Sequence, residues 1–149
     1  MPSQLPLDTL IGLAKENTDE AARTLGRLNA QRTQAEQQLG MLHDYRQDYL
    51  QRLQRAMQAG MAVADCQNYQ RFISTLDDAI SQQASVLRAA EEHLARGRLH
   101  WQEAQRKLNS FDALSQRQAR AEQIAEGRRE QRASDEYSAR LARRAHPMY

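Results

Sequence analysis

Residues that interrupt helices are scarce in this chain of 149 residues, which has six glycines and three prolines. Aromatic residues make up only 5 % of the sequence, whereas charged residues make up 27 %. A composition poor in turn formers and aromatics, and rich in Ala, Glu, Gln, Arg and Leu, is typical of long helices and coiled coils. It argues against a compact globule with an enclosed pocket.

Further features that the sequence lacks exclude other classes of protein. Cys66 is the single cysteine, so an intramolecular disulfide and a cysteine-based metal site are both excluded. No apolar run approaches the roughly 18–20 residues that span a bilayer. The first residues carry neither the basic region nor the apolar stretch of a secretory signal. We therefore expect a cytoplasmic protein without direct membrane insertion.

Charge is nearly balanced, with a net value of +2. Basic side chains are 19 Arg and two Lys, and acidic residues are interspersed among them. From Arg120 onward, seven Arg face five Asp and Glu, and Tyr137 is the one aromatic before the terminal Tyr149. This pattern indicates a solvated surface rather than a nucleic-acid track. A nucleic-acid-binding rod remains an alternative of a different class, and its affinity would fall steeply with salt.

Apolar and small residues recur every seven positions in two series that contain no charged residue: Leu7, Ala14, Ala21, Leu28, Ala35, Leu42, Tyr49 and Ala56, then Cys66, Ile73, Ile80, Leu87, Leu94, Trp101 and Leu108. A companion series runs beside each, which completes a coiled-coil seam. Gly60 marks the break, and Asp65 is a plausible N-cap for the second helix. We predict an all-α fold, a long two-helix antiparallel coiled-coil hairpin forming a single domain over 1–149. Its parts are a tail at 1–6, helices at 7–59 and 66–119, and a turn at 60–65.

A turn centred near residue 63 fixes the register. It places Leu28 near Gly97, Ala35 near Ala90, and Trp101 near Leu25. Leu7 would pair near residue 119, so residues 120–149 have no intramolecular partner. This charged overhang is predicted to be frayed or disordered when free and able to become helical against a partner.

Catalytic and metal-binding patterns are weak. His93 and His100 lie seven residues apart, but a metal would need further ligands converging from the other helix. The sequence has no glycine-rich phosphate loop and no G-x-S-x-G motif. We expect no enzyme activity, no cofactor and no metal site.

Aromatic residues cluster around the turn, where Tyr45, Tyr49, Tyr69 and Phe72 account for four of the eight. Tyr45, Phe72 and Ala79 lie one place off the seam and widen its apolar surface. Exposed aromatic surfaces usually mark protein contacts. Alternatively, the rings fold down on their own seam.

The same residues resemble the FliJ family, the small coiled-coil component of the flagellar type III export apparatus. The resemblance runs from Leu7-x-x-Leu10-x-x-Leu13 through Asp19-x-Ala21-Ala22-Arg23-x-Leu25-Gly26 to Ala35-Glu36-x-Gln38-Leu39-x-Met41-Leu42-x-Asp44-Tyr45-x-x-x-Tyr49. It continues with Gly60 and Asn68-Tyr69-Gln70-x-Phe72-Ile73-x-x-Leu76 and fades after residue 115. The chain departs from some members at Cys66-Gln67, where they carry a large aromatic.

This resemblance implies a stalk-like hairpin that binds the hexameric export ATPase and the export gate and assists export chaperones and substrates, peripheral at the inner-membrane export apparatus. The gate-binding residues it implies are Gln38, Leu42, Tyr45, Tyr49, Phe72, Leu76, Ala79 and Gln83. ATPase binding would fall on the terminal end of the rod, including Arg128, Arg129, Arg132, Arg143 and Arg144. The alternative for the same fold is the stalk protein of a virulence-type type III secretion system. Sequence leaves open the oligomeric state and which end binds which partner.

Overall fold

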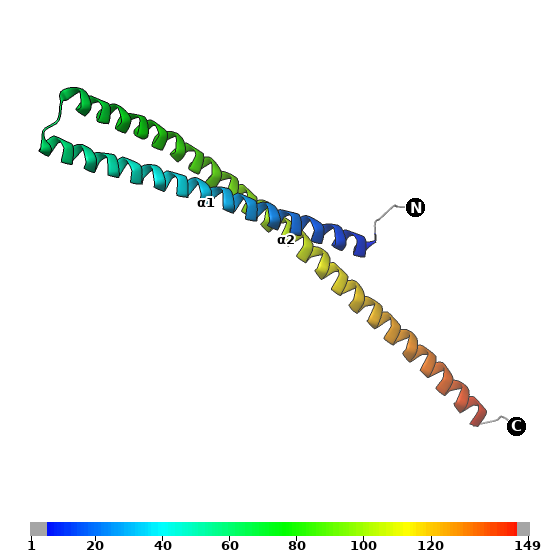
Figure 1. Ribbon diagram of the computed structural model, residues 1–149. Coiled ribbons are helices and arrows are strands. Elements are labelled where there is room, and N and C mark those ends of the chain that lie inside the picture. Colours follow the sequence, from blue (N-terminus) through cyan, green and yellow to red (C-terminus); the bar gives the residue numbers. More distant parts are fainter. Residues whose placement is uncertain (1–5, 146–149) are drawn as a thin grey trace. The chain divides into compact units, whose positions relative to one another are not determined.

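The computed structural model describes residues 6–145 and contains two long helices (Figure 1). Helix α1 spans Leu7–Ala59 with 53 residues, and α2 spans Val63–Ala145 with 83 residues. No strand occurs among the described residues. The all-α prediction is confirmed, and so is the hairpin of two long helices packed against each other. Residues 1–5 of the predicted tail and 146–149 of the predicted overhang lie outside the described residues.

Helix α1 begins after a proline and ends before a glycine. The carbonyl oxygen of Pro6 accepts hydrogen bonds from the backbone N–H groups of Thr9 and Leu10, at 3.0 and 3.2 Å. At the other end, Gly60 has φ of 89° and its N–H donates to the Met57 carbonyl at 3.3 Å. This left-handed conformation after the last helical residue is one that glycine adopts without a side-chain clash. The prediction that Gly60 stops the first helix is confirmed.

The turn is shorter than the sequence suggested. The N–H of Cys66 donates to the carbonyl of Ala62 at 3.1 Å, and α2 already begins at Val63. The predicted turn at 60–65 and helix start at Cys66 are therefore wrong, and α2 continues past 119, the predicted limit of pairing. Asp65 lies in the first turn of α2 rather than at its N-cap. Its carboxylate there still favours the positive end of the helix dipole.

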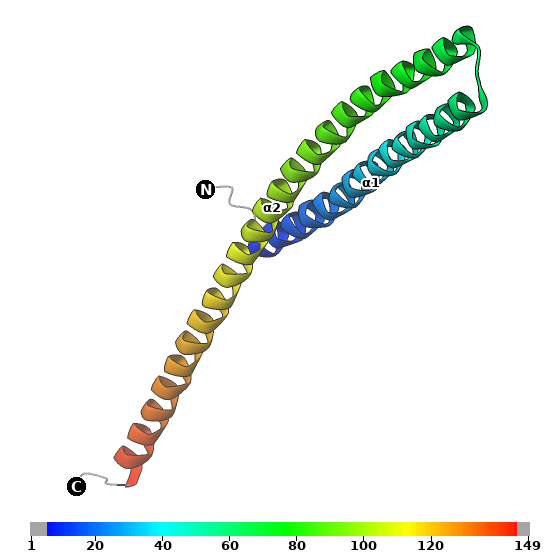
Figure 2. The same cartoon turned by 90° about the vertical axis from the view of Figure 1, so that its left-hand side faces the viewer.

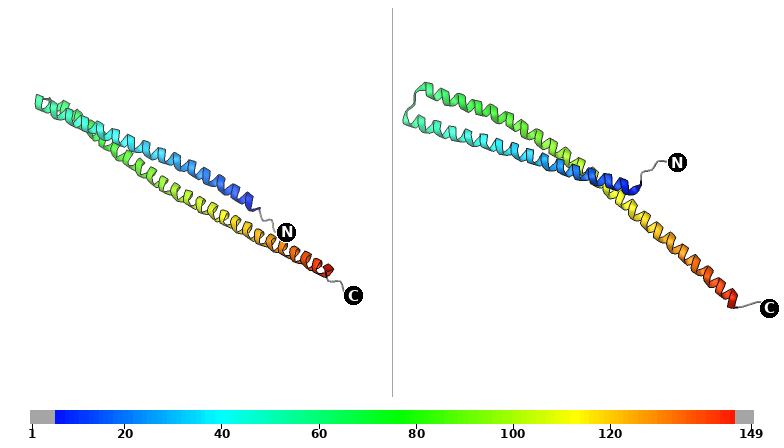
Figure 3. Two further views of the ribbon diagram at one scale, coloured as in Figure 1. Left: turned by 90° about the horizontal axis from the view of Figure 1, so that it is seen from below. Right: turned by 45° about the vertical axis from the view of Figure 1, so that its right-hand side comes forward.

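Two compact units are distinguished along the chain, Asn17–Ala104 and a second one made of Met1–Glu16 with Gln105–Tyr149. In the first unit α1 and α2 run antiparallel, side by side from the turn (Figure 2), and Figure 3 shows the pair from two further sides. The prediction of a single domain over 1–149 stays a prediction.

The seam of the first unit follows the predicted register. A Cβ atom placed on Gly97 would lie 2.6 Å from Leu28 Cδ1, so these two residues are in close contact. Trp101 and Leu25 line the same groove. The predicted contact of Leu28 with Gly97 is confirmed, and Trp101 lies near Leu25 as predicted; the pairing of Ala35 with Ala90 stays a prediction. Small residues on one helix face large residues on the other, which is how a two-helix seam fills its volume.

Little of the chain is buried, because two helices cannot enclose a core. Within residues 6–145 the buried residues are Ala14, Thr18, Ala21, Ala35, Leu53, Ile73, Leu76 and Leu94. In the second unit Leu7, Leu108 and Phe111 are half-buried. Every residue from Gln116 to Ala145 is exposed. Burial thus ends close to the predicted limit of pairing, while the helix continues to Ala145.

Candidate docking face

Two contacts across the helices join members of the predicted gate-binding set. Gln38 faces Gln83, because the Gln83 Nε2 donates to Gln38 Oε1 at 3.2 Å. Tyr49 faces Phe72, with ring centroids 4.3 Å apart. Leu42 and Tyr45 lie between these two contacts on α1, and Leu76 and Ala79 lie between them on α2. The sequence pattern and the structure thus bring all eight residues to one face of the hairpin, which we call the docking face.

An aromatic cluster closes the turn-proximal end of the docking face. The Tyr49 ring lies against Phe72 at an interplanar angle of 38°, and Tyr69 is 6.2 Å from Tyr49 between centroids. The guanidinium carbon of Arg52 is 5.3 Å from the Tyr49 centroid, within cation–π range. Tilted aromatic pairs at these distances are stabilising beyond the area they bury. The cluster therefore holds Tyr49 and Phe72 in fixed positions.

Hydrogen bonds of Gln83 connect the two helices at the other end of the docking face. Besides its bond to Gln38, the Gln83 Nε2 donates to the backbone carbonyl of Ala35 at 3.2 Å. The Gln83 side chain is half-buried, so this amide belongs to the seam rather than the solvent. Polar seam residues of this kind specify register, since a shifted register would leave the amide without its partners.

Exposure separates residues that present a surface from those that support it. Tyr45 is 53 % exposed and Phe72 is 42 % exposed. Leu42, Tyr49 and Ala79 are half-buried, and Leu76 is buried. The alternative that the rings fold onto their own seam applies to Tyr49 only in part, and Tyr45 and Phe72 remain available to a partner.

Two exposed apolar residues next to this set were missed by the sequence reasoning. Met41 is 54 % exposed and lines a shallow groove of about 360 Å³ with Tyr45, Asp44 and Asp48. Val86 is 52 % exposed and follows Ala79 by one heptad. Extending the series of Phe72 and Ala79 by seven would have found Val86. Met41 lies outside both seam series, so its spacing alone does not show whether the neighbouring helix covers it.

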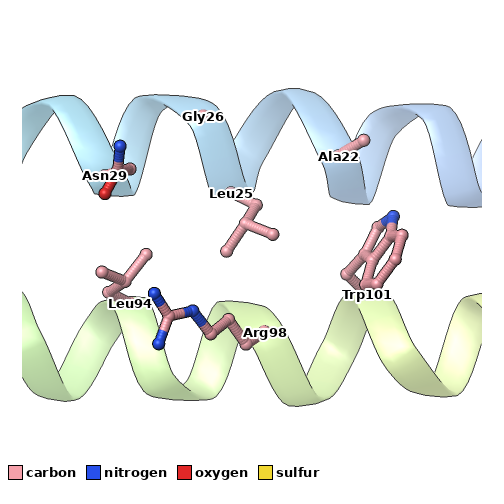
Figure 4. A pocket seen from close by; sticks show the side chains of 7 residues that line it. All are labelled: Ala22, Leu25, Gly26, Asn29, Leu94, Arg98 and Trp101. Atoms are coloured by element: carbon pink, nitrogen blue, oxygen red, sulfur yellow. The ribbon is translucent and has the colours of Figure 1, made fainter.

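A second groove, of about 500 Å³, lies on the hairpin and is lined by Ala22, Leu25, Gly26 and Asn29 of α1 and by Leu94, Arg98 and Trp101 of α2 (Figure 4). The indole stands between the helices beside Ala22, and the Arg98 side chain lies along the groove toward Leu94 (Figure 4). The small side chains of α1 leave this space open because they do not reach the opposite helix.

The geometry of a two-helix hairpin agrees with the family comparison. A sequence model of the family described as "Flagellar FliJ protein" matches residues 3–146. The chain belongs to the FliJ family. It is 38 % identical over 138 residues to the Flagellar FliJ protein of Salmonella typhi, covering 93 % of this chain and 94 % of that relative. It is 37 % identical over 138 residues to the Flagellar FliJ protein of Escherichia coli (strain K12), with the same coverage.

The five arginines predicted to bind the ATPase lie on the exposed part of α2 in this FliJ-family chain. In α2, Arg128, Arg129 and Arg132 are exposed, as are Arg143 and Arg144 in its last turn. The Arg129 guanidinium lies 3.5 Å from the Glu126 carboxylate. Isolated exposed pairs of this kind contribute little to stability. The role of these arginines in ATPase binding stays a prediction.

Metal ligands and membrane-spanning segments can also be assessed in the described part of this FliJ-family chain. No group of three or more His, Cys, Asp and Glu side chains there is placed to hold a metal ion. His93 contacts Arg96, at 3.1 Å between its Nδ1 and an arginine nitrogen. Neither helix, over its described residues, has a stretch long and apolar enough to cross a membrane.

Proposed function

We propose that this FliJ-family component of the flagellar export apparatus is a non-enzymatic, stalk-like coiled coil that binds the hexameric export ATPase and the export gate and assists export chaperones and their substrates. In this role it is cytoplasmic and peripheral at the inner-membrane export apparatus. The observation that carries the proposal is the docking face, which presents aromatic side chains from both helices at fixed positions.

Gate binding is assigned to the docking face. Tyr45 and Phe72 are exposed aromatics on a rigid two-helix support, and aromatic side chains dominate the energetics of protein contacts. The ring of Phe72 is held by Tyr49, so little conformational entropy is lost when a partner covers it. Ordered aromatic side chains of this kind suit a specific contact.

ATPase binding is assigned to the exposed part of α2. Residues 116–145 bury nothing on their own chain, although they are helical. This part of α2 lacks a buried face, which supplies most of the stability of helices in proteins. A partner that covers this segment would supply that packing. Whether it is ordered in the free protein stays a prediction.

Replacing Tyr45 and Phe72 together by alanine tests the gate assignment. The double variant should lose at least about thirtyfold in affinity for the export gate protein, the effect of removing a central aromatic anchor. Helical circular dichroism should be kept, since neither side chain is buried. Leu99→Ala is the matched control, because Leu99 is 61 % exposed and lies off the docking face. Unchanged gate binding by the double variant would refute the assignment.

Deleting residues 120–149 tests the ATPase assignment. The shortened chain should bind and stimulate the export ATPase more weakly, while the thermal melt of the hairpin remains, because the described residues removed are exposed. A triple variant, Arg128→Gln with Arg129→Gln and Arg132→Gln, separates charge from length, and Arg88→Gln in the hairpin is its control. Full ATPase stimulation by the shortened chain would rule out this role.

A further inference from the structure

The docking face extends beyond its eight predicted residues. Met41 lies one helical turn before Tyr45, and the two side chains line one shallow groove. Val86 continues the series of Phe72 and Ala79 by one heptad. Residues at these spacings share a face of a helix. Tyr45, Phe72, Met41 and Val86 are all between 42 and 54 % exposed, so the enlarged face presents four large apolar side chains.

Such a surface needs an apolar partner. Single exposed apolar residues are normal, but a contiguous group on one face is a feature of interaction sites. The Tyr49–Phe72 contact and the hydrogen bonds of Gln83 hold the two helices together beneath this face. It is elongated along the hairpin, because its members follow the helix axes from Val86 toward Phe72. An amphipathic helix laid along the hairpin matches this form of apolar surface.

The two borders of the face differ in charge. On α1, Asp44 and Asp48 line the groove beside Met41 and Tyr45. Asp48 pairs with Arg52 at 3.0 Å, whereas Asp44 makes no ion pair among residues 6–145. On α2, the residues one turn before Phe72, Ala79 and Val86 are uncharged: Asn68, Thr75 and Gln82. Directly before Phe72 and Ala79, Arg71 and Asp78 carry opposite charges, so the border along α2 has no net charge, whereas the border along α1 is acidic at Asp44.

We propose that Met41 and Val86 belong to the gate-binding surface, and that this surface receives an amphipathic helix of the gate protein whose apolar stripe carries basic residues along the side facing Asp44 and Asp48. The proposal rests on the assigned gate function and adds the chemistry of the segment that binds. The one-sided charge also fixes the direction of the contact, because a helix laid the other way round would place its basic residues against the neutral border.

Binding of the full-length variants to detergent-solubilised gate protein tests the proposal at low and high salt. Met41→Ser and Val86→Ser should each weaken binding about fivefold or more at both salt concentrations, since they remove apolar contacts. Asp44→Lys should weaken binding strongly at low salt and much less at high salt, because exposed charges are screened. Leu99→Ser and Asp19→Lys are the matched controls, an exposed apolar residue and an exposed acid away from the face.

The outcomes separate this proposal from the assigned function. If Tyr45→Ala with Phe72→Ala loses gate binding while Met41→Ser and Val86→Ser bind normally, the enlarged surface is wrong and the gate assignment stands. If none of these variants loses binding, the gate assignment itself fails. Equal behaviour of Asp44→Lys and Asp19→Lys at both salts would overturn the basic partner. Loss of a dimer in light scattering on Met41→Ser and Val86→Ser, without loss of gate binding, would show that the surface joins two copies of this chain.

Discussion

Substitution of Gly97 is the most direct test of the hairpin register. Gly97 lies in the interior of α2, where replacing glycine by alanine ordinarily stabilises a helix by about 0.8–1.0 kcal/mol. The added Cβ would here lie 2.6 Å from Leu28 Cδ1 and 3.6 Å from Leu25 Cδ1. The Leu28 methyl must therefore move, and forcing a side chain off its rotamer costs about 0.5–1.5 kcal/mol. The two effects nearly cancel, so we expect little net change in the free energy of unfolding for Gly97→Ala.

Gly40 supplies the matched control. It is also in a helix interior, but a Cβ added there has nothing within 4 Å. Gly40→Ala should therefore show the full gain of about 1 kcal/mol. Gly97→Leu should cost about 1–3 kcal/mol, because a large side chain cannot fit where the helices approach. Combining it with Leu28→Ala should recover part of that loss, because the two sites share one space.

Urea unfolding followed by far-ultraviolet circular dichroism, repeated at several protein concentrations, measures these free energies. Equal stabilisation by Gly97→Ala and Gly40→Ala would refute the close approach of Leu28 to Gly97. So would a Gly97→Leu variant as stable as the parent chain. Independent, additive effects of Gly97→Leu and Leu28→Ala would show that the two residues do not face each other.

Two further perturbations probe the turn and the seam. Gly60→Ala should destabilise the hairpin by about 1–2 kcal/mol, because an L-residue is disfavoured at a φ of 89°, and Gly60→Asn should cost less; equal stability of all three chains would contradict the left-handed turn. Arg46 forms an ion pair across the helices with Asp77, and both side chains are more than one third exposed. Reversing either charge should therefore cost about 0.2–1 kcal/mol at low salt, with recovery in the double reversal Arg46→Asp with Asp77→Arg. An undiminished loss at high salt would show that the effect is not electrostatic.

Much of the fold could be predicted because heptad spacing and the position of Gly60 determine it. Counting sevens located both helices, and the turn then placed Leu28 opposite Gly97. The start of α2 could not be found this way, because Ala62, the residue before Val63, is not one of the residue types that favour a helix N-cap. Asp65 looked like a cap because its type fits, but the backbone bond from Cys66 to Ala62 places the helix start earlier.

The site was predictable to the extent that it follows the seam. Tyr49 and Leu76 are seam residues, and Tyr45 and Phe72 are their near neighbours in the same pattern. The sequence could not reveal that Phe72 packs on Tyr49 while staying 42 % exposed, because that depends on how two rings tilt against each other. Met41 could not be predicted for a related reason. A residue outside the seam series can be an isolated exposed residue or part of a larger apolar surface. Which of the two applies depends on the side chains that the neighbouring helix places beside it.

The left-handed turn at Gly60 also has a kinetic consequence. Contacts close to the turn, such as the one between Tyr49 and Phe72, close short loops, whereas the contact between Leu28 and Gly97 closes a long one. Loop closure is entropically cheaper for short loops, so we expect the helices to associate first beside Gly60 and then zip toward the far end. Fraying should run in the opposite direction. The docking face lies in the part of the hairpin that is expected to form first and unfold last. Its residues on α1 and α2 would therefore stay together even while the helices separate transiently at the end far from the turn.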